Sequence, residues 1–129
     1  MQIIDHTSIE KALNVDKACG MLKDGFRLFS QGEVLQAPSG SMVMPQGSFH
    51  IRYGMIRGAR EFFVKHATGF NENQNHGLPP GDGFTAVYSS ENGMLKYLLN
   101  DQGMLTDIRT ALAVRICAEA FTPRPTDVA

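Results

Sequence analysis

The sequence has few cysteines, no marked excess of charge and no long apolar run. Its 129 residues contain only two cysteines, Cys19 and Cys117, which are too few for a disulfide framework. Both fall in segments with helical spacing, and they are expected to fill small spaces in a core. Free cysteines of this kind are typical of a reducing compartment, so a cytoplasmic protein is predicted.

The balance of charge excludes further classes of protein. Twelve basic and thirteen acidic side chains give a formal net charge of −1, and no basic block argues for binding to nucleic acid. The apolar runs are a few residues long, so no membrane-spanning segment is expected. The first five residues, Met1 to Asp5, lack the basic-then-apolar layout of a signal peptide.

What is present suits one compact domain. A chain of 129 residues that is 43% hydrophobic can bury a single core. We expect this domain to cover residues 1–121, and residues 122–129, which include Pro123 and Pro125, to form a linker-like tail.

The N-terminal third reads as a short strand followed by helix. Met1 to Ile4 is apolar, and the Thr7 to Glu10 segment has the capping-box pattern that predicts a helix start near Thr7. Helical spacing continues to Phe29, and Gln31-Gly32 is expected to end it. Asp16 is a candidate cap for a second helix within this stretch.

From Glu33 to Asn100, short runs rich in Val, Ile, Tyr and Phe alternate with Pro, Gly and Asn, which predicts strands. The expected strands are Glu33–Gln36, Ser41–Met44, Phe49–Ile56, Glu61–Thr68, Phe84–Ser89 and Met94–Leu99. Hairpins are expected at Gly58-Ala59 and Glu91-Asn92-Gly93, and Asn71 to Gly83 is expected to be a long, functional loop.

A last helix is predicted from about Thr106, as its cap, to Phe121. The fold class is therefore α+β: N-terminal helices, a mainly antiparallel sheet of about six strands and a C-terminal helix. Such a sheet has edges that need a partner, and homodimerisation through an edge or face is one solution.

Four cations are candidates for binding a ligand: Arg52, Arg57, Lys65 and Arg109. Lys65 ends the apolar run Phe62 to Val64, where an ammonium needs either an anionic partner or an exit to water. Arg109 is expected in the first turn of the last helix, where free N–H groups and a guanidinium together suit a carboxylate. The alternative is that Arg109 pairs with Asp101, Asp107 or another structural acid.

Several segments occur together, in order, in a known family. They are His50 to Gly54, Ile56 to Gly58, Phe62 to Lys65, Gly69 to Asn73, Gly77 to Pro79 and Leu105 to Ala111. In this order and spacing they resemble the substrate-binding domain of the ornithine cyclodeaminase/mu-crystallin family, over nearly the whole chain.

This resemblance implies that Lys65 and Arg109 hold the carboxylate of a substrate. Family members act on amino and imino acids with a nicotinamide cofactor and usually form dimers through this domain. A further family arginine would fall near Ser39 and is absent, which puts ornithine-like recognition in doubt. Arg52 or Arg57 is a candidate to compensate.

The family's Gly-rich nucleotide-binding segment would follow the last helix and does not occur in these residues. Gly81 to Ala86 has similar glycine spacing but precedes a predicted strand, so we reject it as a phosphate-binding turn. No metal site is expected, because His66 and His76 lack partners at ligand spacing.

We therefore expect a stand-alone, truncated substrate domain, oligomeric and not catalytic alone, that binds a small carboxylate or amino acid. NAD is expected only if a separate Rossmann partner exists. The alternatives are one half of such a two-part NAD-dependent enzyme, or a purely structural remnant in which Lys65 and Arg109 pair with internal acids.

Overall fold

The computed structural model describes residues 1–122, so the predicted tail lies outside the described residues except for Thr122. The expected α+β class is confirmed, with helices at both ends of a seven-stranded sheet. The strands are β1 (Gln2–Asp5), β2 (Val34–Gln36), β3 (Gly40–Met44), β4 (Gly47–Ile56), β5 (Glu61–Gly69), β6 (Gly81–Ser89) and β7 (Leu95–Asn100). The helices are α1 (His6–Ala12), α2 (Val15–Ser30), the short 3₁₀ helix η1 (Asn71–His76) and α3 (Met104–Phe121).

The sheet order is β1-β7-β6-β5-β4-β2, with β3 paired to the far end of β4. All pairs are antiparallel except β1 and β7, which run parallel, so the sheet is mixed. The two predicted hairpins are confirmed. Gly58 (φ 75°) and Gly93 (φ 72°) supply the left-handed backbone that each turn requires.

Two predicted helix caps were wrong. The Asp5 carboxylate accepts the Ser8 N–H (2.8 Å) and caps α1, which begins at His6, one residue before Thr7. The Asn14 side chain accepts the Lys17 N–H (2.9 Å) and caps α2, in place of Asp16. Both caps follow the ordinary rule, since a short polar side chain on extended backbone reaches the free N–H groups of the first turn.

The long loop after β5 is more ordered than expected. It contains η1, and its last three residues belong to β6. The Asn73 amide donates to the Pro79 carbonyl (3.0 Å) and the Leu78 N–H to the Asn73 carbonyl (3.0 Å), so the loop is closed by its own hydrogen bonds.

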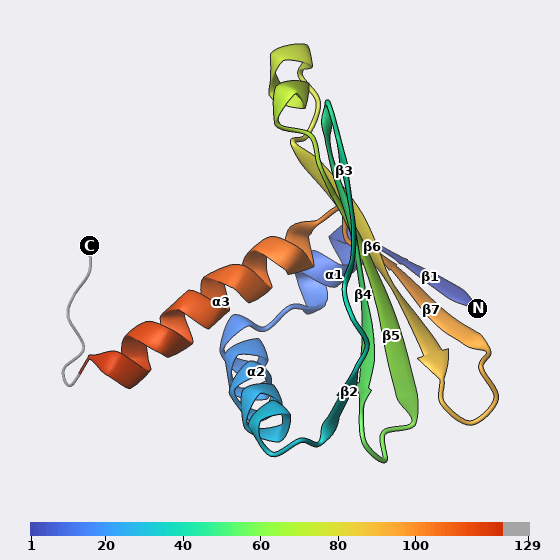
Figure 1. The fold of residues 1–129 in the computed structure, drawn as a ribbon, viewed down its shortest axis with the longest axis vertical. Helices are drawn as coiled ribbons and strands as arrows, with labels where there is room; N and C mark the ends of the chain where they lie inside the picture. The colour runs from blue at the N-terminus through green and yellow to red at the C-terminus, as the bar shows by residue number, and fades with distance from the viewer. Residues whose placement is uncertain (123–129) are drawn as a thin grey trace.

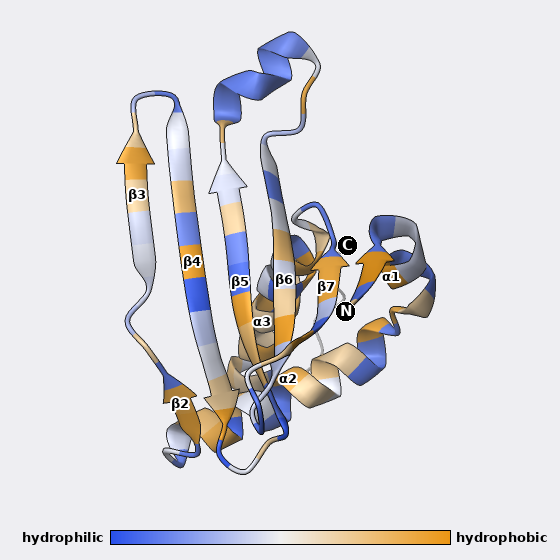
Figure 2. Cartoon of the chain, turned by 90° about the vertical axis from the view of Figure 1, so that its right-hand side faces the viewer, coloured by the Kyte–Doolittle hydropathy of each residue, from blue (hydrophilic) through white to orange (hydrophobic). Residues whose placement is uncertain are grey.

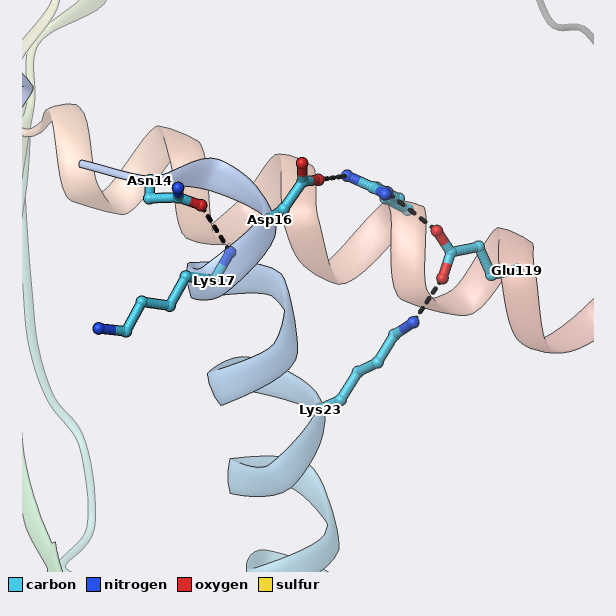
Figure 3. A network of polar contacts seen from close by, with 6 residues as sticks. Asn14, Asp16, Lys17, Lys23 and Glu119 are labelled. Carbon is cyan, nitrogen blue, oxygen red and sulfur yellow. Dashed lines mark hydrogen bonds and ion pairs between the residues drawn. The ribbon is translucent and has the colours of Figure 1, made fainter.

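The three α-helices lie on one side of the sheet (Figure 1). Salt bridges join α2 to α3: Glu119 accepts from Lys23 (2.6 Å) and from Arg115 (2.9 Å), and Arg115 also reaches Asp16 (3.2 Å) (Figure 3). These side chains are largely solvated, so their contribution to stability is small.

The strand register separates two faces of the sheet. Arg52, Lys65 and Thr85 share one face, together with Gly83. A Cβ on Gly83 would lie 3.7 Å from the Gly103 nitrogen, at the start of α3, so this is the helix side. The opposite face, here named the open face, carries Ile51, Tyr53, Val64, Phe84, Ala86 and Leu98. None of the described α-helices covers it (Figure 2).

Burial is incomplete in the described residues. Cys19, Ala86 and Leu112 are the buried hydrophobic residues there, and no large side chain is fully buried. Cys19 fills a core position as predicted, whereas Cys117 is exposed, so the core prediction for Cys117 was wrong. Within the described range, no helix is long and apolar enough to cross a membrane.

Candidate carboxylate-binding site

Lys65 lies in the middle of β5 and is half-buried. Its direct cross-strand partner on β4 is Arg52, so two cations occupy adjacent positions on the helix side of the sheet. Like charges placed directly opposite each other on a sheet destabilise the pairing. The arrangement is therefore unfavourable unless an anion is also present.

The electrostatic surroundings of Lys65 identify a third cation. Burial lowers the pKa of the Lys65 ammonium from its ordinary 10.5, and the nearby charges of Arg109 and Arg52 lower it further. Asp101 and Asp107 act in the opposite direction on the same pKa, with smaller effect. The structure thus brings Lys65, Arg52 and Arg109 into one neighbourhood, from β5, β4 and α3.

Arg109 is placed differently from the expectation. Because α3 begins at Met104, Arg109 is in its second turn and not its first. The Thr106 cap was also wrong: the Asp101 carboxylate accepts the Leu105 N–H (2.9 Å), and Gly103 (φ 87°) makes the preceding bend. Asp101 is 3% exposed, so it is a buried structural acid that holds the start of α3.

None of the three cations forms an ion pair within residues 1–122. The ion pairs there involve other basic residues, namely Lys23, Arg27, Lys96 and Arg115. Arg109 accordingly makes no salt bridge with Asp101 or Asp107, the two acids that the alternative interpretation assigned to it.

Arg57 lies apart from this group. Its side chain donates to the Gly32 carbonyl (3.3 Å) and its backbone N–H to the Glu33 carbonyl (2.8 Å), at the β4–β5 turn. The four last residues of β4 lie between it and Arg52, so the two positions are about five residue steps apart, roughly 17 Å at about 3.3 Å per residue. Arg57 therefore joins the start of β2 to the end of β4.

A cavity of about 400 Å³ lies near these cations, although none of the three lines it: Ala67 follows Lys65 by two residues on β5, and Asp107 precedes Arg109 by two residues on α3. The cavity lies between the β5–β6 loop and the N-terminal end of α3. Its lining residues are Ala67, Thr68, Asn71, Pro79, Pro80, Gly81, Asp82, Gln102, Gly103, Thr106 and Asp107. Sequence reasoning singled out the loop but not Asn71, Asp82 or Gln102, whose roles depend on how the loop folds back over β6.

Comparison with known proteins agrees with this architecture. Residues 2–127 match the family model described as the ornithine cyclodeaminase/mu-crystallin family. The chain belongs to this family.

The proteins that this chain matches are much longer than the chain itself. A Rhizobium meliloti (strain 1021) protein named as a dehydrogenase is 29% identical over all of the chain, which spans 40% of that relative. An archaeal alanine dehydrogenase dimer with bound NAD has a TM-score of 0.83 at 21% identity, over 91% of this chain and 36% of that one. A Thermococcus litoralis Δ1-pyrroline-2-carboxylate reductase, in complex with NADH and L-proline, has a TM-score of 0.85 at 16% identity. The match covers 92% of this chain and 37% of the reductase. These structural matches show the fold.

The described residues do not fit the nicotinamide cofactor of such relatives. Gly81 to Gly83 open strand β6 and precede no helix, unlike a phosphate-binding turn. A Cβ on Gly83 would lie 2.7 Å from the His66 carbonyl oxygen, so this glycine permits close strand pairing. No residue here is assigned to the cofactor.

The histidines do not form a metal centre in residues 1–122, where no cluster of three metal-ligating side chains occurs. His66 stacks on Phe84 (ring centroids 4.9 Å apart) and contacts Phe49 (4.7 Å). His76 is an exposed residue at the end of η1.

Proposed function

We propose that this chain is a substrate-binding domain that holds the carboxylate of a small amino acid or related acid between Lys65 and Arg109. The observation that carries the proposal is a group of cations that forms no ion pair within residues 1–122, near a cavity whose lining includes Ala67 and Asp107. Burial, and after it the charges of Arg109 and Arg52, lower the pKa of the Lys65 ammonium, so an anion bound beside this half-buried charge is favourable.

The two side chains have complementary roles in this proposal. Arg109 presents a planar guanidinium that can bind both carboxylate oxygens, and Lys65 adds a compact charge from the floor of the site. L-Proline in the complex of the Thermococcus litoralis reductase is a ligand of this chemical class. The cavity near the cations leaves room for the remainder of a small ligand.

Binding alone does not complete a redox reaction. We propose that turnover requires a nicotinamide-binding domain that residues 1–122 do not supply, because no phosphate-binding turn occurs among them. The free cysteines Cys19 and Cys117 are consistent with action in the cytoplasm.

A thermal-shift series tests the binding proposal. L-Amino acids and 2-oxo acids are added to the wild type, Lys65→Ala, Arg109→Ala and the control Lys96→Ala, which removes a cation that is paired with Glu61 and does not belong to the group. A ligand at a hundredfold its Kd stabilises the native state by about 2.7 kcal/mol. We expect a shift in the wild type and the control that both site variants lose. A flat wild-type response to every acid contradicts the proposal.

We further propose that two copies associate through the open face. Tyr53 is 42% exposed and Phe84 37% exposed there, which leaves aromatic surface uncovered. The archaeal alanine dehydrogenase relative is a dimer. A single-species monomer in sedimentation at micromolar concentration would contradict this part.

A second candidate function is one half of a two-part enzyme. It is favoured by α3, whose apolar residues are spread around the helix and leave Val114 (65% exposed) and Phe121 (86% exposed) in solvent. A helix that is apolar all round is normally buried. This candidate predicts NADH-dependent turnover only after addition of a nucleotide-binding partner chain, and no turnover with any such partner contradicts it.

A further inference from the structure

Arg52 is the one member of the cation group that the proposed carboxylate contact does not use. It is exposed, belongs to β4, and lies directly opposite Lys65 in the antiparallel register. Within the described residues its guanidinium takes part in no ion pair. Like charges directly opposite each other lower stability, so Arg52 at this position has a cost that a structural role does not explain.

The acids around the site leave the charge of Arg52 uncompensated. Asp101 is buried and accepts the Leu105 N–H, so its carboxylate is committed to the start of α3. Asp107 lines the cavity and affects Lys65 less than the arginines do. A single ligand carboxylate between Lys65 and Arg109 would still leave one guanidinium without a counter-charge.

The two sides of Lys65 differ in charge. Toward β6, the direct neighbour is the uncharged Thr85, and the acid of the cavity lining that acts on Lys65 is Asp107 of α3. Toward β4, the direct neighbour is Arg52. A ligand with a second negative group would therefore be repelled from the cavity side and attracted to the β4 side.

We propose that Arg52 is a specificity residue that binds a second carboxylate, so that the site takes a small dicarboxylate in preference to a monocarboxylate. This inference rests on the proposed carboxylate contact of Lys65 and Arg109. Opposite residues of neighbouring strands have Cβ atoms about 5 Å apart, which suits a diacid of about four carbons. The first carboxylate binds Lys65 and Arg109, and the second binds Arg52.

The test is isothermal titration calorimetry at constant ionic strength, with succinate and the matched monoacid butyrate. The proteins are the wild type, Arg52→Gln, Lys65→Ala and the control Arg57→Gln, whose arginine lies at the β4–β5 turn. One charge-assisted contact is worth about 1.5–3 kcal/mol, so succinate should bind the wild type and the control about tenfold or more tightly than butyrate. Arg52→Gln should abolish this preference and leave butyrate affinity within about threefold. Circular dichroism confirms that each variant is folded.

The outcomes separate this inference from the function on which it rests. Equal affinity for the two acids in the wild type, or a preference that survives Arg52→Gln, overturns the diacid inference. If butyrate binding is still lost in Lys65→Ala, the proposed carboxylate contact stands. If inorganic phosphate binds at the site as tightly as succinate, the inference is also overturned, because the site would then prefer a compact dianion to two separate carboxylates. Absence of any binding to the wild type overturns both proposals.

Discussion

Arg52 and Lys65 are direct cross-strand neighbours on the helix side of the sheet, and Arg109 of α3 adds a third positive charge beside them. Three cations in one place oppose folding, since each raises the cost of charging the others. Sites that bind ligands commonly depart from the arrangement that would be most stable. This cluster is such a departure, and its effect on stability is measurable.

Replacing Lys65 with methionine should stabilise the free protein at neutral pH. The substitution keeps the apolar stem and removes one of two positive charges that face each other across the strands. Relief of this repulsion should raise the free energy of unfolding by about 0.2–1 kcal/mol. Urea denaturation measures the change, and Lys96→Met, which breaks the Lys96–Glu61 ion pair, should be slightly destabilised instead. If Lys65→Met has a clearly lower free energy of unfolding, Lys65 has an internal acidic partner and the structural-remnant interpretation gains support.

The stability of the wild type should depend on pH in a defined direction. Burial and the charges of Arg109 and Arg52 lower the pKa of Lys65 in the folded state below 10.5. Between that lower pKa and 10.5, the unfolded chain therefore binds more protons than the folded protein. Stability therefore rises as the pH increases from the folded pKa toward 10.5. The difference in unfolding free energy between Lys65→Met and the wild type should shrink over the same interval. A constant difference across alkaline pH would contradict the assignment.

Asp101 should be the residue that holds the start of α3. Asp101→Ala removes the carboxylate that accepts the Leu105 N–H and should lower the free energy of unfolding by about 1–2 kcal/mol. Thr106→Ala is the matched control and should change it little, because the Thr106 hydroxyl caps no described N–H group. Chemical denaturation distinguishes the two variants, and the reverse order of effects would show that the cap is assigned to the wrong residue.

Two glycine substitutions should act in opposite directions. Gly83→Ala places a Cβ 2.7 Å from the His66 carbonyl oxygen and should destabilise the β5–β6 pairing. Gly25→Ala meets nothing within 4 Å, inside α2, and should stabilise by about 0.5–1 kcal/mol. Thermal unfolding measures both. A neutral Gly83→Ala would mean that the β6 backbone yields at this position.

A charge on the open face should prevent self-association. Tyr53→Glu introduces a carboxylate among Val64, Ala86 and Leu98, and burying it against a second copy without a partner is strongly unfavourable. Analytical ultracentrifugation should show a shift to monomer. Met94→Glu, at the exposed β6–β7 turn, should leave association unchanged. An oligomer that persists in Tyr53→Glu would place the interface elsewhere.

Local features were predicted from sequence with fair success. The hairpins at Gly58 and Gly93 were correct, because a positive φ at a turn is a property of the turn itself. Helix starts were less certain, since several capping side chains lie close together. Asp5 and Asn14 cap their helices, whereas the capping-box pattern had pointed to Thr7 for the first helix and Asp16 had been the candidate for the second.

The candidate site could be predicted only in part. Residue types and the family resemblance pointed to Lys65 and Arg109, and Arg52 was named only with Arg57, as a candidate to compensate for the absent family arginine. The end of β4 at Ile56 was predicted correctly, but the separation of Arg57 from the group depends on the pairing of Arg52 with Lys65, a register that no local pattern specifies. Asp101 was missed as a cap because the backbone bend at Gln102 and Gly103 brings it onto α3, and this bend is a matter of tertiary structure.

The most direct test of the central claim is to measure the pKa of Lys65 itself. NMR signals of its ε-methylene group are recorded as a function of pH, with and without a carboxylate ligand. The account predicts a pKa below 10.5 in the free protein, and a rise when the carboxylate binds beside the ammonium. Lys65→Ala identifies the signal. A Lys65 pKa that is the same at saturating and at zero concentration of every acid tested would show that no carboxylate binds there, and would contradict the proposed function.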